Sequence, residues 1–153
     1  MSLWDDCVAV HGRPGVEEAC LDLQDQYGQC VSLLLWRLWA VAETRPVSAE
    51  TMRQACACAR AWDGAAISPL RAARRAIKGP LAPIADTSRV ALRTRIAILE
   101  LEAERLLIDA LEGLSAPRSG FRDEALEALA AVSAAWNGSA PRDALARLIT
   151  AAR

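Results

Sequence analysis

The sequence predicts an all-α fold, a compact bundle of seven or eight helices. Alanine and leucine dominate, whereas β-branched and aromatic residues are few. Apolar residues recur at helical spacing in one segment after another, and no segment alternates as a strand does. The chain has 153 residues, 53% of them hydrophobic and 24% charged. That length and balance predict a single helical domain, 1–153, with a sizeable core.

The stretch over about 30–43, CVSLLLWRLWAVAE, predicts the central helix of the bundle. A surface helix keeps a polar face, and this one is apolar almost all the way round, so it must be buried. Arg37 is its only charge before Glu43. Its guanidinium must reach water or pair with an acid. The candidate partners are acids of the preceding segment: Glu17, Asp22 and Asp25.

Two helices are expected before the central one. Ser2 caps the first, with Asp5 in the capping-box position, and Gly12 ends it. The second runs over about 16–27, and Gly28 is a natural stop for it. Both segments carry apolar stripes that suit packing against the central helix.

Four shorter helices are predicted from caps and breaks. Ser48 caps a helix that runs to about 62, and the Asp63-Gly64 pair is expected to break it. Ser68 followed by proline opens a short fifth helix to about 77. The last two helices expected are 121–136 and 141–152.

The segment 79–83, GPLAP, is the most strongly broken in the chain and the best candidate for a hinge. It would separate an N-terminal helical layer from a part built on one long helix, about 87–114. Three or so heptads along that helix suit either a hairpin arm or a dimer contact. The seam consists of Leu92, Ile96, Leu99, Ala103, Leu106 and Ala110.

Several runs of the sequence carry a family resemblance. They are Trp4, PGVEEACL at 14–21, LQDQYG at 23–28, LLLWRLW at 33–39 and ELEAERL at 100–106. With these runs the chain resembles a bacterial family of short proteins catalogued as domain of unknown function 2390. The family pattern commonly opens the third helix with acidic and asparagine residues, where this chain has Cys30 and Ser32. The resemblance implies a helical fold and no established activity.

The residue inventory argues against an enzyme. Nucleophilic catalysis needs a base, and His11, the one histidine, lies at a helix end. Cys56 and Cys58 point about 200° apart on a helix and cannot chelate a metal together. Glu100 and Glu104 are expected on a solvated helix face. We therefore predict no catalytic, metal or cofactor site.

Charge is distributed unevenly along the chain. Residues 1–52 hold eight acids and three bases, whereas residues 68–99 hold seven bases and one acid. The second segment predicts a cationic ridge that could dock an acidic partner, including the acidic half of a second copy. The absence of aromatic residues there disfavours nucleic-acid binding through 71–95. The ridge residues are Arg71, Arg74, Arg75, Lys78, Arg89 and Arg93.

Tryptophan supplies the other candidate site. Trp36 and Trp39 flank Arg37 on the central helix, and Trp4 is expected to approach the same core. Large aromatics commonly fill the core of a small bundle. The same set could line an apolar ligand pocket between helices. The sequence leaves both interpretations open.

The functional expectation that combines these observations is a cytosolic, non-enzymatic protein of adaptor or regulatory type. It would act through contacts with an unknown protein partner, with a homodimer through the long helix as one form. The alternatives are a binder of small apolar ligands in a Trp-lined core and, less favoured, a nucleic-acid binder. No membrane span or signal peptide is predicted. Five cysteines, an odd number, indicate a reducing compartment without disulfides.

Overall fold

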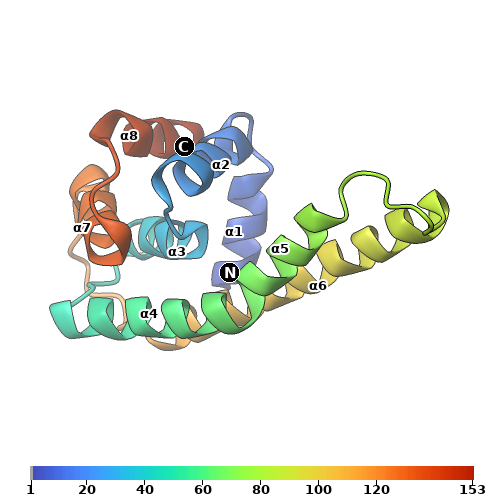
Figure 1. Ribbon diagram of the computed structural model, residues 1–153. Helices are drawn as coiled ribbons and strands as arrows, with labels where there is room; N and C mark the ends of the chain where they lie inside the picture. The colour runs from blue at the N-terminus through green and yellow to red at the C-terminus, as the bar shows by residue number, and fades with distance from the viewer. Residues whose placement is uncertain (1) are drawn as a thin grey trace.

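The computed structural model describes residues 2–153, which form eight α-helices and one π-helical turn without a strand. Figure 1 shows a bundle from which two antiparallel helices, α5 and α6, project as an arm. The elements are α1 (Leu3–His11), α2 (Val16–Tyr27), α3 (Val31–Ala42), α4 (Ala49–Trp62), η1 (Asp63–Ile67), α5 (Ser68–Ala76), α6 (Asp86–Gly113), α7 (Ala125–Asn137) and α8 (Arg142–Ala151). The all-α prediction and its single long helix are confirmed.

The central helix is α3, as predicted. It contacts α1, α2, α4, α6 and α7, and most of its side chains are buried, Trp36 and Leu33 completely. The Trp36 indole Nε1 donates a hydrogen bond of 2.8 Å to Ser115 Oγ, which satisfies its one polar atom. Trp36 is therefore core, and α3 provides the surface on which the bundle packs.

The predicted helix ends at the N-terminal side are confirmed. Ser2 Oγ accepts from the amide of Asp5 at 3.1 Å, and Ser48 Oγ accepts from the amide of Thr51 at 3.0 Å. Gly28 ends α2 with a φ of 60°. That left-handed backbone angle favours glycine, and a Cβ there would lie 2.7 Å from Asn137 Nδ2 and would force the end of that side chain to move.

The expected break at Asp63-Gly64 is wrong. The chain remains helical there and widens into the π turn η1, so that α4, η1 and α5 follow one another as a bent rod (Figure 1). Ile67 is only 3% exposed, and Ser68 Oγ donates to Asp63 Oδ2 at 2.7 Å. Burial of that isoleucine outweighs the local preference of the Asp-Gly pair. The irregular turn also accommodates Pro69, which has no backbone N–H.

The segment 79–83 lies in the connection between α5 and α6, at the tip of the arm. Arg89 ties this connection to α6, because its Nη1 donates to the carbonyl oxygens of Ile77 and Lys78, both at 2.8 Å. Its guanidinium also pairs with Asp86. A hinge at 79–83 stays a prediction.

Helix α7 begins four residues later than predicted, at Ala125, where Glu124 caps it by accepting from the amide of Glu127 at 2.9 Å. Residues 115–124, which precede α7, are not helical and lie against the C-terminal end of α3. The amide of Ser119 donates to the carbonyl of Thr44 at 2.9 Å, and the carboxylate of Asp123 pairs with Arg37. These tertiary contacts hold the segment non-helical against its helical propensity.

Candidate functional site

A large recess in the described part of the chain lies between the bundle and the arm. It has a volume of about 710 Å³ and is lined by residues of α1, α2, α3, η1, α5, α6 and α7. We call it the arm cleft. The π turn contributes Asp63 and Ile67 to its wall, so the irregular turn that the sequence did not predict helps to shape the recess.

The walls of the arm cleft are mainly apolar. Two tryptophans are held in place at its edge by neighbouring groups. The Trp136 Nε1 donates to the carbonyl of Gly28 at 2.9 Å, and Arg60 lies 4.5 Å from the ring centroid of Trp136. Arg105 lies 5.5 Å from the ring centroid of Trp4. The apolar lining residues are Trp4, Val8, Leu21, Val31, Leu35, Ile67, Leu101, Ile108 and Trp136.

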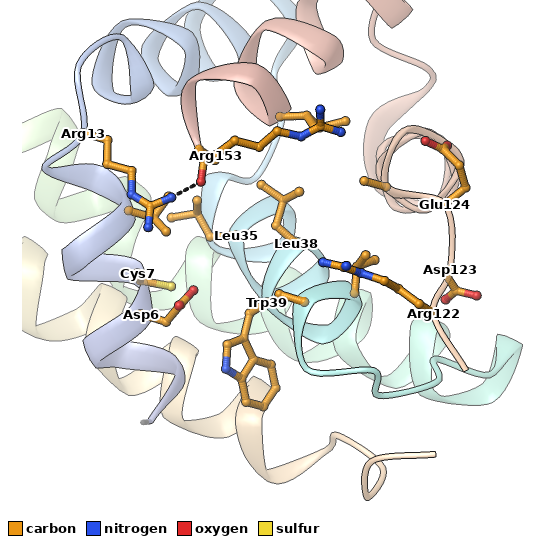
Figure 2. A pocket seen from close by; sticks show the side chains of 16 residues that line it. Asp6, Cys7, Arg13, Leu35, Leu38, Trp39, Arg122, Asp123, Glu124 and Arg153 are labelled. Carbon is orange, nitrogen blue, oxygen red and sulfur yellow. Dashed lines mark hydrogen bonds between the residues drawn. The ribbon is translucent and has the colours of Figure 1, made fainter. Parts of the chain in front are cut away.

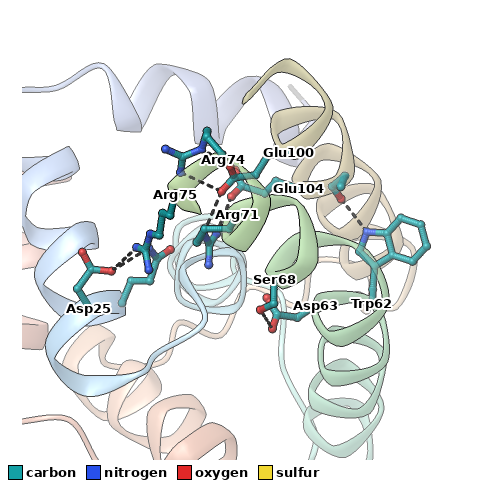
Figure 3. A network of polar contacts seen from close by, with 11 residues as sticks. Asp25, Trp62, Asp63, Ser68, Arg71, Arg74, Arg75, Glu100 and Glu104 are labelled. Carbon is teal, nitrogen blue, oxygen red and sulfur yellow. Dashed lines mark hydrogen bonds and ion pairs between the residues drawn. The ribbon is translucent and has the colours of Figure 1, made fainter. Parts of the chain in front are cut away.

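One wall carries a cluster of four charged side chains, Arg71 and Arg74 from α5 with Glu100 and Glu104 from α6 (Figure 3). We call it the Arg–Glu cluster. Arg71 donates from Nε to Glu100 at 2.9 Å and from Nη2 to Glu104 at 3.1 Å. Arg74 donates from Nε to the second oxygen of Glu100 at 2.6 Å. Glu100 is only 6% exposed, so its expected place on a solvated face is wrong.

The two glutamates have opposite pKa shifts. Burial alone would raise the pKa of Glu100, but the hydrogen bonds and charges of Arg74 and Arg71 outweigh it, and the pKa lies below its usual range. Burial raises the pKa of Glu104, which Arg71 only partly offsets and the charge of Glu100 reinforces. Glu100 is thus a fixed anion that orders two guanidinium groups, while Glu104 is the more readily protonated member.

Not all hydrogen-bond donors of the Arg–Glu cluster are used within the described chain. Arg71 uses Nε and Nη2 for its carboxylate partners, and Arg74 uses the same two nitrogens. Among residues 2–153, neither Nη1 has an acceptor within hydrogen-bonding distance. Both guanidinium groups can therefore receive a further acceptor without losing an existing bond.

Three cysteines also line the arm cleft. Burial raises the pKa of Cys7, Cys20 and Cys30 to about 12 in each case. The thiolate is the nucleophile and metal ligand, so these side chains stay protonated and act as small apolar groups near neutral pH. They contribute small, polarisable apolar groups to the lining of the arm cleft, but no reactive group.

An ion pair joins the arm to the bundle beside the arm cleft. Arg75 on α5 donates to Asp25 on α2 at 3.1 Å, and the lining residue Gln24 donates to the same carboxylate at 3.2 Å (Figure 3). Both partners of the pair are more than half exposed. Exposed pairs contribute about 0–1 kcal/mol, so this contact opposes opening of the recess only weakly.

The six residues of the predicted cationic ridge do not form one exposed surface. Arg71 and Arg74 face the two glutamates of α6, and Arg89 is buried against backbone carbonyls. Arg75 is paired with Asp25 beside the arm cleft, Arg93 is half-buried and Lys78 is exposed near the tip. The count of charges along the sequence identified the basic segment. It did not indicate that the glutamates of α6 would pair with Arg71 and Arg74.

The four residues of the predicted tryptophan pocket are also separated. Trp4 lines the arm cleft and Trp36 lies in the core. Trp39 lines a second recess of about 580 Å³, in which Figure 2 shows Arg13, Arg122 and Asp123 around the end of α3. Arg37 is 5% exposed and pairs with Asp123, not with Glu17, Asp22 or Asp25. Asp22 and Asp25 instead pair with Arg147 and Arg75.

Part of the site was predicted from the sequence: Arg71 and Arg74 as candidates for a partner surface, and Trp4 for a pocket. The other parts were not, because Glu100 and Glu104 were expected on a solvated face and nothing linked the cysteines, Trp136 and residues 63–67. One signal was available: α5 and α6 carry opposite charges one helical turn apart, at 71 and 74 and at 100 and 104. Two helices joined by a short loop pack antiparallel, which brings such sets together.

No helix among residues 2–153 combines the length and the apolar character needed to cross a membrane.

Comparison with known proteins identifies the family of the chain. Neither a curated protein nor a solved structure matches the chain. Residues 2–111 match the family described as "Protein of unknown function (DUF2390)", a range that includes α1 to α5 and most of α6. The chain therefore belongs to this family.

Proposed function

We propose that this protein binds a small amphipathic molecule in the arm cleft. The observation that carries the proposal is the combination of an apolar recess of about 710 Å³ with the Arg–Glu cluster on one wall. Small-molecule sites typically measure about 300–1,000 Å³ and are apolar with a few convergent polar groups. The arm cleft has the size and the lining of such a site.

The lining defines the chemistry of the ligand. Its body is apolar and fits against Leu21, Leu101 and the ring of Trp4. Its head carries hydrogen-bond acceptors, because the free Nη1 groups of Arg71 and Arg74 are donors only. A medium-chain carboxylic acid or a molecule of similar shape satisfies both requirements. The role that we propose is binding without catalysis, and the lining thiols, which are protonated near neutral pH, supply no cysteine nucleophile.

A fluorescent probe tests this site. We expect the environment-sensitive dye anilinonaphthalene sulfonate to bind the protein and decanoate to displace it better than decylamine does. Replacing Leu101 with Trp should fill the recess and weaken dye binding at least about tenfold, or about 1.4 kcal/mol. The matched control is Ile98→Trp, since Ile98 is exposed on the same helix but does not line the arm cleft. Equal dye binding by the two variants would refute the proposal.

The second candidate is action through protein contacts, as an adaptor or regulatory protein. The observation that favours it is a set of leucines on α6 that are about half exposed and lie outside the arm cleft: Leu92, Leu99 and Leu106. Partly exposed leucines of this number on one helix are typical of a contact surface.

For either role we propose a cytosolic location in a bacterial cell, because all five cysteines are free thiols. Fractionation of cells that express the tagged protein tests the location.

A further inference from the structure

Independently of the ligand site, we propose that two copies of this chain associate through α6, antiparallel and around a two-fold axis at Leu99. Leu92, Leu99 and Leu106 are 51%, 50% and 52% exposed. They follow one another at seven-residue intervals and so form one stripe along the helix. We call them the leucine stripe.

Two other residues of the predicted heptad seam, Ala103 and Ile96, are used within the chain, whereas Ala110 is exposed. Ala103 is buried against the bundle, and the Trp62 indole Nε1 donates to its carbonyl oxygen at 2.8 Å. Ile96 is half-buried. The seam is therefore divided lengthwise, with one side packed inside the molecule and the leucine stripe left outside. Leucine at all three outer positions is unexpected for a helix face that meets only water.

Charges beside the leucine stripe make it complementary to itself. Arg95 lies four residues before Leu99 and Glu102 three residues after it, on the same flank of the helix. In an antiparallel pair centred on Leu99, residues at equal distances in opposite directions face one another. Leu92 of each copy then faces Leu106 of the other, and Arg95 faces position 103, one residue or about 1.5 Å along the helix axis from Glu102, which its long side chain can reach. A two-fold contact repeats this favourable pair twice.

A parallel pair lacks these ion pairs. It would place Arg95 level with Arg95 and Glu102 level with Glu102, so neither charge would meet one of opposite sign. An unrelated acidic partner would gain from Arg95 but would be repelled by Glu102. The charge pattern thus selects a second copy of this chain in the antiparallel orientation.

Charge reversal tests the pairing by sedimentation equilibrium of the full chain. We expect a concentration-dependent dimer for the native protein. Arg95→Glu and Glu102→Arg should each weaken it at least about tenfold, since each creates two repulsive contacts, while the double reversal should restore it. The two single variants mixed together should associate, because both cross pairs are then of opposite sign. Lys78→Glu, an exposed charge at the arm tip, is the control and should change nothing.

Each alternative gives a distinct result. A native protein that stays monomeric over the whole concentration range would overturn the proposal. So would single reversals that dimerise as well as the native chain, the outcome expected for a parallel pair. Neither Arg95 nor Glu102 lines the arm cleft, so dye binding by the same variants tells whether the ligand site is intact.

Discussion

Replacing Glu100 with Gln is expected to lower the free energy of unfolding by about 3–5 kcal/mol, the usual loss when one partner of a buried ion pair is removed. Glu100 is 6% exposed and accepts hydrogen bonds from both Arg71 and Arg74. The neutral amide of Gln carries no negative charge to balance the two partly buried guanidinium groups of Arg71 and Arg74. Chemical denaturation at neutral pH measures the effect. The control is Asp109→Asn, an exposed carboxylate of the same helix, with an expected change within about 0.5 kcal/mol.

The pH dependence gives this prediction a second readout. Because the pKa of Glu100 is lowered in the folded protein, its contribution is present above the ordinary value of 4.5 and is lost as the pH falls through the folded pKa. The stability difference between native protein and Glu100→Gln should therefore shrink in acid. A difference that is constant with pH would show that the carboxylate charge does not cause the loss.

The companion variant Glu104→Gln should behave in the opposite way. The pKa of Glu104 is raised in the folded protein, so its charged form is disfavoured there and its protonated form is preferred. The native chain therefore gains stability relative to this variant as the pH falls through the raised pKa. Opposite pH trends in the stability of the two variants would show that the fold favours the charged form of Glu100 and the protonated form of Glu104, although the two carboxyls lie one helical turn apart.

The second large effect is expected at the ion pair between Arg37 and Asp123. Arg37 lies 5% exposed on the central helix, and its Nε and Nη1 have no hydrogen-bond partner among residues 2–153. Replacing Asp123 with Asn should destabilise the fold by about 2 kcal/mol, less than a fully buried pair would lose because the Asp123 side chain is 34% exposed. Thermal and urea unfolding of the two proteins measures this difference.

The matching variant Arg37→Met separates the charge from the packing. Methionine keeps the apolar length of the side chain and removes the buried guanidinium, so stability should equal or exceed that of the native protein by up to about 2 kcal/mol. In that background Asp123→Asn should change little, within about 0.5 kcal/mol. A loss of several kcal/mol in Arg37→Met would instead show that the ion pair itself stabilises the bundle.

The Arg37 pair and the Arg–Glu cluster differ in what surrounds them. Arg37 pairs with a residue of the non-helical segment before α7, which it holds against the end of α3. The cluster lies on the wall of the arm cleft, and the Nη1 groups of Arg71 and Arg74 have no acceptor among residues 2–153. The first is therefore a structural ion pair, and the second is the cluster that we propose orients a ligand.

The sequence by itself determined the helices and which of them is central. Periodicity located all eight α-helices, capping serines and glycines marked several of their ends, and the apolar run of 30–43 identified α3 as the centre. These features are local, because hydrogen bonds within a helix and the burial of one apolar face depend on residues a few positions apart.

Only the tertiary structure decided which charges meet and where the chain departs from local preference. The partner of Arg37 lies 86 residues further along the chain, and the partners of Arg71 lie 29 and 33 residues away. Asp63 and Gly64 stay helical because Ile67 is buried, and 121–124 stays non-helical because Asp123 is bound. Such contacts depend on how whole helices are placed against one another, a spatial relation that spacing along one segment does not encode.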